Sequence, residues 1–379
     1  MLFVKSHIRR EFMKTTKITA LLLVPILSCV FFSQSISALD VSARSAIVIE
    51  ASTRQVVFEK DADTRRPMAS TTKIMTALVA LESGDITREI TVDAAAAGVE
   101  GSSIYLKAGD KITLESLLWA LMLESANDAA AAIAIGVAGS IEAFAELMNA
   151  KAAELGLANT HFTNPHGLSD DEHYTTARDL AKLTAAAMEN ETFCEIVSTD
   201  KYRIAYSDTA RSLHNHNKML HLYDGAVGVK TGFTKVSGRC LVSAAERDGM
   251  TLIAVTLGAP NDWDDHTAML DLGFSSLERA VLIEPYESAF ISPCIGSEKS
   301  ELTIKNREGL SVVLPKSGHE ITRRIILPRY FWAPVEKDSV VGKIEFYDGD
   351  ARLGEVALYA EESAYRLQYK QSFFERIFD

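Results

Sequence analysis

Hydrophobic residues change their spacing along this chain of 379 residues, and these changes limit the folds that it can adopt. Between Ser45 and Lys60, two short runs rich in Val and Ile flank the polar turn Ser52-Thr53-Arg54, which predicts a β-hairpin. Ile74, Leu78 and Leu81 then follow a helical period, and strand-like runs return after about residue 198. Strands at both ends with helices between them predict one α/β or α+β unit closed by antiparallel pairing.

The helices and strands of this first unit have recognisable limits. The first predicted helix begins after Pro67 and ends near Gly84. Four more are predicted at residues 114–124, 129–135, 140–155 and 176–188. Ser140 and Thr176 are suitable N-caps for the last two. The predicted strands occupy residues 226–229, 239–244 and 251–257.

Beyond about Ala280 the apolar runs become short and alternating, which predicts a small all-β module. The runs occupy residues 302–304, 310–314, 325–327, 343–346 and 354–359. The final segment, residues 365–379, places Leu367, Gln371, Phe374 and Phe378 on one helical face beside basic residues. Such a stripe suits either a membrane interface or a helix packed on the β module, and the sequence leaves both open.

The N-terminus has the order of a secretory signal. Five basic residues precede an uncharged apolar run from Ile18 to about Phe32, and the small residues Ser35 and Ser37 follow. A retained membrane anchor would need roughly 20 apolar residues, and this run is short for one. We therefore predict a signal peptide at residues 1–37, cleavage after Ser37, and an exported protein that acts outside the cytoplasmic membrane.

Charge and cysteine content narrow the function classes. The formal net charge of −12 becomes −16 without residues 1–37, because five positive and one negative side chain are removed. An acidic surface disfavours nucleic acid as a partner. The remaining cysteines are far apart and form no C-x-x-C pair, so no zinc site is predicted: Cys194, Cys240 and Cys294. The sequence allows either one disulfide among them or three separate thiols.

Ser70-Thr71-Thr72-Lys73 is the first motif with chemical potential. Residues three apart share one face of a helix, so Lys73 can reach the Ser70 hydroxyl if a helix begins near Ser70. Ser70 needs a base to become a nucleophile, and Lys73 can be that base only when it is neutral. Lowering its pKa from about 10.4 to about 7 or 8 means roughly 4 kcal/mol of bias against the ammonium, which burial and a second cation can supply.

Two further motifs are weak by themselves. Ser125-Ala126-Asn127 lies at a predicted helix break, where Ser and Asn commonly act as caps. Lys230-Thr231-Gly232 lies at the end of a predicted edge strand, where a peptide can pair with the backbone and a carboxylate can meet Lys230 and Thr231. An ordinary strand exit with a surface lysine would explain the second motif equally well.

Taken together and in this order, the three motifs are the signature of active-site serine penicillin-binding proteins and β-lactamases. The chain resembles the low-molecular-weight D-alanyl-D-alanine carboxypeptidases in particular. The stretches that carry the resemblance are residues 67–76, 125–129, 164–168, 174–180 and 228–234. The resemblance implies an α+β domain of the β-lactamase and transpeptidase type at residues 38–280, with an antiparallel sheet, flanking helices and a helical subdomain, followed by a small all-β domain at residues 281–364.

The same resemblance implies a role for each matching residue. Ser70 would form the acyl-enzyme, Lys73 would take its proton, and Ser125 would pass a proton to the departing D-alanine. Asn127 would hold a substrate amide, Lys230 would help to keep Lys73 neutral, and Thr231 would bind the terminal carboxylate. Gly232 and Phe233 would line the substrate strand, with an oxyanion hole formed by the N–H groups of Ser70 and Phe233. The implied partners are peptidoglycan stem peptides, β-lactams as inhibitors and a membrane surface, with no metal or other cofactor. Arg239 and the bulky Phe233 remain without an explanation.

Other functions are open to comparison. A class A β-lactamase normally has a Glu-x-x-x-Asn motif, which does not occur between Asn127 and Lys230. A metal hydrolase would use His214, His216 and His221 near Asp208, but no His-Glu-x-x-His motif is present. A non-catalytic wall-binding protein would not need Lys73 beside Ser70. Endopeptidase and transpeptidase activities share the acyl-enzyme, so the sequence does not separate them from carboxypeptidase activity.

Overall fold

The computed structural model describes residues 39–368. The predicted signal peptide at residues 1–37 therefore lies outside the described residues, as do residues 369–379 of the predicted amphipathic segment. Within the described range no single helix is long and apolar enough to cross a membrane, although α3 (Asn127–Ala138) and α4 (Ile141–Glu154) have enough length and apolar character as a bent pair.

Five antiparallel strands form the central sheet of the first unit, in the order β2-β1-β9-β8-β7. They are β1 (Ser45–Glu50), β2 (Val56–Lys60), β7 (Ala226–Thr234), β8 (Gly238–Arg247) and β9 (Met250–Leu257). β7 is an edge strand, so one of its sides is open to further pairing. The predicted N-terminal hairpin and antiparallel closure are confirmed.

The sheet is covered on both faces, which explains the nearly continuous apolar character of its inner strands. Side chains alternate across a strand, so Ile47 and Ile49 enter one hydrophobic core while Ala46 and Val48 enter another. The first core contains the helices that follow β2, and the second contains α8 (Asp262–Ser276).

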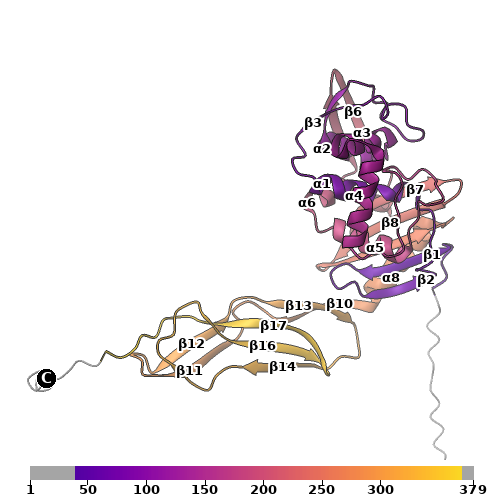
Figure 1. Ribbon diagram of the computed structural model, residues 1–379. Coiled ribbons are helices and arrows are strands. Elements are labelled where there is room, and N and C mark those ends of the chain that lie inside the picture. The colour runs from indigo at the N-terminus through magenta and orange to yellow at the C-terminus, as the bar shows by residue number, and fades with distance from the viewer. Residues whose placement is uncertain (1–38, 369–379) are drawn as a thin grey trace, which may run out of the picture. The chain divides into compact units, whose positions relative to one another are not determined.

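The helices of the first core are α1 to α6, drawn from indigo to magenta in Figure 1. Besides α3 and α4 they are α1 (Lys73–Glu82), α2 (Leu114–Leu123), α5 (Ala177–Ala187) and α6 (Glu191–Ser198). The Ser140 and Thr176 side chains accept hydrogen bonds from the backbone N–H groups of Ala143 and Asp179, as expected of N-caps. Two small two-stranded sheets and a short helix complete the unit. The sheets are β3 (Glu89–Thr91) with β4 (Lys111–Thr113) and the hairpin of β5 (Lys201–Tyr206) with β6 (Thr209–His214), and the helix is α7 (Met219–Leu222).

Several predictions of local structure were wrong. The helix expected to start near Ser70 is preceded by a separate 3₁₀ turn, η1 (Ala69–Thr72), and α1 begins only at Lys73. The strand that carries Lys230-Thr231-Gly232 does not end there but continues to Thr234. Neither α6, α8 nor the β5–β6 hairpin was predicted from the sequence. α8 is hard to recognise because Asp265 and His266 are buried on its inner side, where an apolar stripe is expected.

The C-terminal part of the described chain is an all-β module, as predicted. Its strands are β10 (Leu277–Ile283), β11 (Ala289–Ile295), β12 (Glu301–Asn306), β13 (Leu310–Pro315), β14 (Ile321–Ile326), β15 (Phe331–Trp332), β16 (Val340–Asp348) and β17 (Ala351–Ala360). Six of them form one sheet in the order β14-β16-β17-β12-β11-β15, and β10 pairs with β13. Leu302, Ile304, Ile344 and Leu358 lie in the module's own core. The α+β class with a separate all-β domain is thereby confirmed.

The three cysteines of the described chain are free thiols. Cys240 and Cys294 are buried, whereas Cys194 is only partly so. Of the two alternatives left open by the sequence, the structure therefore has separate thiols.

Candidate active site

Ser70 lies in the turn η1, and neighbouring hydroxyl groups fix the shape of that turn. Thr71 Oγ1 donates a hydrogen bond to the Met68 carbonyl at 2.6 Å, and Thr72 Oγ1 donates to the Ala69 carbonyl at 2.8 Å. Both threonines are fully buried, so these hydrogen bonds satisfy polar groups that would otherwise be costly in the core. Ser70 itself lines an open pocket.

Lys73 is fully buried, and its Nζ has three oxygen neighbours. The atom lies 2.7 Å from Asn127 Oδ1, 2.7 Å from the His166 carbonyl oxygen and 3.0 Å from Ser70 Oγ. The first two oxygens can only accept hydrogen bonds. A neutral amine has two N–H groups and one lone pair, so donating to these two acceptors leaves the lone pair for the Ser70 hydroxyl. This arrangement suits proton transfer from Ser70 to Lys73.

Burial is the largest cause that lowers the pKa of Lys73 well below its ordinary value. The nearby Lys230 lowers it further, whereas the buried carboxylate of Asp128 acts in the opposite direction. Burial also lowers the pKa of Lys230 to about 7. Lys230 is therefore charged in only part of the molecules near neutral pH, so burial of the Lys73 amine contributes more to its neutrality than the second cation does.

A loop at residues 164–168 supplies the backbone oxygen that Lys73 contacts. Asn164 Oδ1 accepts a hydrogen bond from the Gly167 backbone at 2.8 Å, and Thr76 Oγ1 of α1 donates to the Pro165 carbonyl at 2.6 Å. Gly167 has a φ of +87°, and a Cβ there would lie 1.9 Å from the Ala69 carbonyl oxygen. A glycine is therefore required for the loop to pack against the turn that carries Ser70.

Ser125 and Asn127 come from the break between α2 and α3, as predicted. Ser125 has a φ of +59° and lines the same pocket as Ser70. Asn127 is buried beneath the pocket, and its Nδ2 donates to the Glu100 carbonyl at 2.6 Å while its Oδ1 faces Lys73. The contact with a substrate amide that the sequence suggested for Asn127 stays a prediction, because both ends of this amide already have protein partners.

Strand β7 brings the third motif to the turn of Ser70. Lys230 is buried and its Nζ donates to the Thr231 carbonyl at 2.9 Å, whereas Thr231, Gly232 and Phe233 line the pocket. A Cβ at Gly232 would lie only 2.9 Å from the Ser70 backbone nitrogen. The absence of a side chain at Gly232 thus lets the strand approach the nucleophile's N–H group closely.

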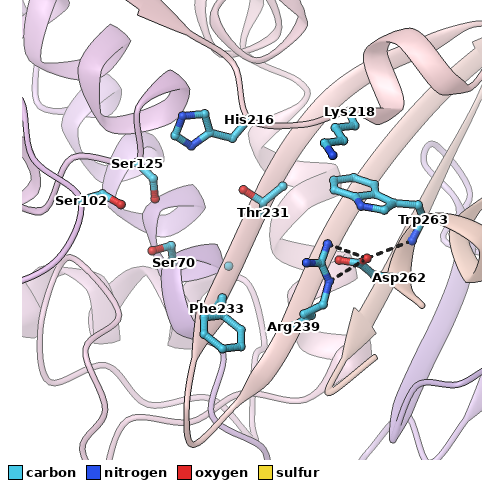
Figure 2. Close-up of a pocket in the computed structure, with 11 residues that line it drawn as sticks. Ser70, Ser102, Ser125, His216, Lys218, Thr231, Phe233, Arg239, Asp262 and Trp263 are labelled. Atoms are coloured by element: carbon cyan, nitrogen blue, oxygen red, sulfur yellow. Dashed lines mark hydrogen bonds and ion pairs between the residues drawn. The ribbon is translucent and has the colours of Figure 1, made fainter. Parts of the chain in front are cut away.

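The pocket has a volume of about 440 Å³, and residues from all three motifs line it. Figure 2 shows Ser70, Ser102 and Ser125 on one wall and Thr231, Arg239 and Trp263 across from them. Five further lining residues had no role predicted from the sequence: Ser102, Lys218, Arg239, Asp262 and Trp263. His216, considered there only as a metal ligand, also lines the pocket.

Arg239 projects from β8 at one end of this pocket. Its guanidinium donates to Asp262 Oδ1 from Nε at 2.9 Å and from Nη2 at 2.8 Å, and it lies 5.6 Å from the centre of the Trp263 ring. Burial raises the pKa of Asp262, and the ion pair with Arg239 opposes that effect. The pair therefore keeps a buried carboxylate paired at the start of α8.

Comparison with known proteins now adds to this geometry. A model of the D-alanyl-D-alanine carboxypeptidase family matches residues 32–261, and a model of the penicillin-binding protein 5 C-terminal domain matches residues 293–366. The chain belongs to the D-alanyl-D-alanine carboxypeptidase family.

Curated relatives cover most of the length of this carboxypeptidase. The D-alanyl-D-alanine carboxypeptidase DacF of Bacillus subtilis is 31% identical over 337 residues, which cover 86% of this chain and 87% of the relative. DacC of Escherichia coli is 34% identical and covers 83% and 82% respectively. Among solved structures, penicillin binding protein 5 from Haemophilus influenzae aligns with a TM-score of 0.66 at 25% identity. The alignment covers 87% of this chain and 100% of that protein. A Streptomyces DD-transpeptidase aligns with a TM-score of 0.60 at 35% identity, over 63% and 99%.

The histidines that suggested a metal hydrolase face two different carboxylates in this carboxypeptidase. His214 and His216 lie 3.8 and 3.6 Å from the Glu124 carboxylate oxygens, whereas His221 lies 2.9 Å from Asp200 Oδ1. No group of three or more metal-binding side chains comes together within residues 39–368.

Proposed function

We propose that this carboxypeptidase removes the terminal D-alanine from peptidoglycan pentapeptides through an acyl-enzyme on Ser70. One observation carries the proposal. The Lys73 amine is buried, lies 3.0 Å from Ser70 Oγ, and has two carbonyl acceptors for its N–H groups. A lysine in that environment is suited to be a general base for the neighbouring hydroxyl.

The reaction has two stages. Ser70 Oγ attacks the carbonyl carbon of the penultimate D-alanine, and its proton passes to Lys73 Nζ. The C–N bond breaks, Ser125 relays a proton to the departing amine, and free D-alanine leaves. Water then attacks the ester carbonyl and gives a proton to Lys73. The C–O bond to Ser70 breaks, Lys73 returns the proton to Ser70 Oγ, and the shortened peptide leaves as a carboxylic acid.

The binding roles follow from the positions of the β7 residues. The Thr231 hydroxyl and the charged form of Lys230 would hold the terminal carboxylate. The backbone N–H groups of Ser70 and Phe233 would stabilise the developing oxyanion, which requires the close approach that Gly232 permits. β-Lactams would acylate the same serine, because their ring amide presents a strained carbonyl to it.

The test uses fluorescent penicillin and a pentapeptide ending in D-alanyl-D-alanine. The purified protein should be labelled and should release D-alanine, with the products identified by mass so that cleavage of cross-linked peptides would also be seen. Ser70→Ala should lose both activities, whereas Ser102→Ala, in the same pocket wall, should retain labelling. Undiminished labelling of Ser70→Ala would refute the assignment of the nucleophile.

We also propose that the protein is exported and lies at the outer face of the cytoplasmic membrane through its C-terminal segment. Two of the described residues in that segment are apolar and exposed, Tyr365 at 65% and Leu367 at 62%. The full chain should sediment with lipid vesicles and a chain ending at residue 364 should not; equal sedimentation of the two would refute the anchor.

A further inference from the structure

A second cavity lies beyond Phe233, at the hairpin that joins β7 to β8. It has a volume of about 270 Å³ and shares Phe233 and Arg239 with the main pocket. Its other side-chain contributors include Arg44, Lys235 and Val236. The two cavities therefore adjoin at Phe233 and Arg239, which are paired across β7 and β8. Figure 2 shows these two side chains on the neighbouring strands.

The side chains of this second cavity are basic and apolar. Arg44 and Lys235 are both exposed, and within residues 39–368 neither one forms an ion pair, whereas Arg239 is paired with Asp262. Of the residues that the structure describes, no carboxylate side chain lines the cavity. Phe233 and Val236 expose 66% and 65% of their surface, which is unusual for large apolar side chains on one hairpin. On a chain with a net charge of −12, this cavity is a local basic and apolar surface.

The direction of β7 determines which part of a substrate comes here. A peptide that pairs antiparallel with the open edge of β7 has its C-terminal carboxylate beside Thr231 and its scissile carbonyl at the turn of Ser70. Its preceding residues then run along Phe233 and Thr234 toward Lys235. Because an extended chain advances about 3.4 Å per residue, the two residues before the D-alanyl-D-alanine end reach the hairpin.

We propose that this cavity is an upstream subsite that selects stem peptides with a free carboxylate on one of the two residues preceding D-alanyl-D-alanine. Arg44 and Lys235 attract the carboxylate, and Phe233 and Val236 pack against the aliphatic part of the same residue. This inference rests on the proposed function, because it takes the orientation of the substrate from the acyl-enzyme at Ser70. The bulky Phe233, which the motifs alone left unexplained, then acts as the wall between the two sites.

The experiment compares two peptides that differ only in charge. One carries glutamate at both positions before D-alanyl-D-alanine, and the other carries glutamine there. The wild-type protein should have a kcat/KM about five- to tenfold higher for the glutamate peptide at low salt, since two exposed charge contacts contribute about 1 kcal/mol together. In the double variant Arg44→Gln, Lys235→Gln, the two peptides should have about equal kcat/KM. In the wild-type protein, the preference for the glutamate peptide should weaken with added salt.

Controls separate this subsite from the proposed function. Lys107→Gln removes an exposed lysine outside both cavities and should keep the preference. Labelling of Ser70 by fluorescent penicillin should be equal in all variants, because penicillin carries no carboxylate upstream of its reactive amide. Equal kcat/KM for both peptides in the labelled wild-type protein, or an unchanged preference in the double variant, would overturn the subsite; absent labelling of the wild-type protein would instead overturn the proposed function.

Discussion

The floor and the rim of the active site contrast sharply. The pocket floor, which we define as Lys73, Asn127 and Lys230, is almost completely buried, and every one of these side chains has a protein partner. The pocket rim, defined as Phe233, Lys235 and Arg239, is exposed, and Lys235 has no ion-pair partner among the described residues. Burial lowers the pKa of both floor lysines, Lys73 and Lys230.

This difference separates chemistry from selection. A buried amine is costly unless it is neutral or well paired, so the floor lysines are maintained at the expense of stability. The rim side chains of Phe233 and Lys235 can change with little effect on the floor, because they are exposed to solvent. We therefore expect floor substitutions to alter the rate for every substrate, and rim substitutions to alter the preference among substrates.

The largest effect should follow from removing the floor base. Lys73→Met should lower the rate of acylation by penicillin about 10³-fold or more, because general base catalysis contributes about 10²- to 10⁴-fold. Among the described residues, no other amine lies at hydrogen-bonding distance from the Ser70 hydroxyl. The unfolding temperature should stay equal or rise, since a desolvated amine is replaced by an apolar group of similar length. Stopped-flow acylation and thermal unfolding measure the two quantities.

The control for this experiment is Lys107→Met, which removes an exposed lysine. It should leave the acylation rate unchanged. A Lys73→Met protein that is folded and acylates at the wild-type rate would remove Lys73 from the mechanism and would break the contrast between floor and rim.

The sequence predicts the floor better than the rim, and the reasons are local. The spacing of Ser70 and Lys73 indicated their contact even though the turn that carries them is 3₁₀ rather than α-helical, because residues three apart are neighbours in both. The His166 contact could not be predicted from side chains, since it is made by a backbone carbonyl. Asp262 and Trp263 were missed because the buried side of α8 mixes polar with apolar residues, which hides its helical period in the sequence. Arg44 and Arg239, far apart in the chain, come together only through the register of the sheet.

A smaller effect is expected at Gly232, where the edge strand approaches the floor. Gly232→Ala should lower the acylation rate about 10²-fold, because the new Cβ would displace the strand from the Ser70 N–H group and loss of one oxyanion donor costs about 10²- to 10³-fold. Gly156→Ala is the matched control. Gly156 has a φ of +67°, which strains an alanine, but a Cβ there would have no atom within 4 Å. This substitution should lower the free energy of unfolding by about 1 kcal/mol without changing the acylation rate. Acylation of Gly232→Ala at the wild-type rate would show that the strand can yield without loss of the oxyanion site.

The smallest effect concerns pH and separates the two floor lysines. Lys73 must be neutral to accept the Ser70 proton, so kcat/KM should fall as the pH decreases through the Lys73 pKa, which burial lowers well below its ordinary value. Lys230 must be charged to attract the substrate carboxylate, and burial lowers its pKa to about 7, so kcat/KM should also fall as the pH rises above that value. At pH 8 the charged fraction of a group with this pKa is roughly one tenth, and a loss of about tenfold in kcat/KM relative to the plateau is expected.

Lys230→Arg retains its charge throughout this range and should flatten the alkaline limb of the profile while leaving the acid limb in place. An alkaline limb that is the same in Lys230→Arg would assign it to another group, and the role of Lys230 in binding the carboxylate would then have to be abandoned.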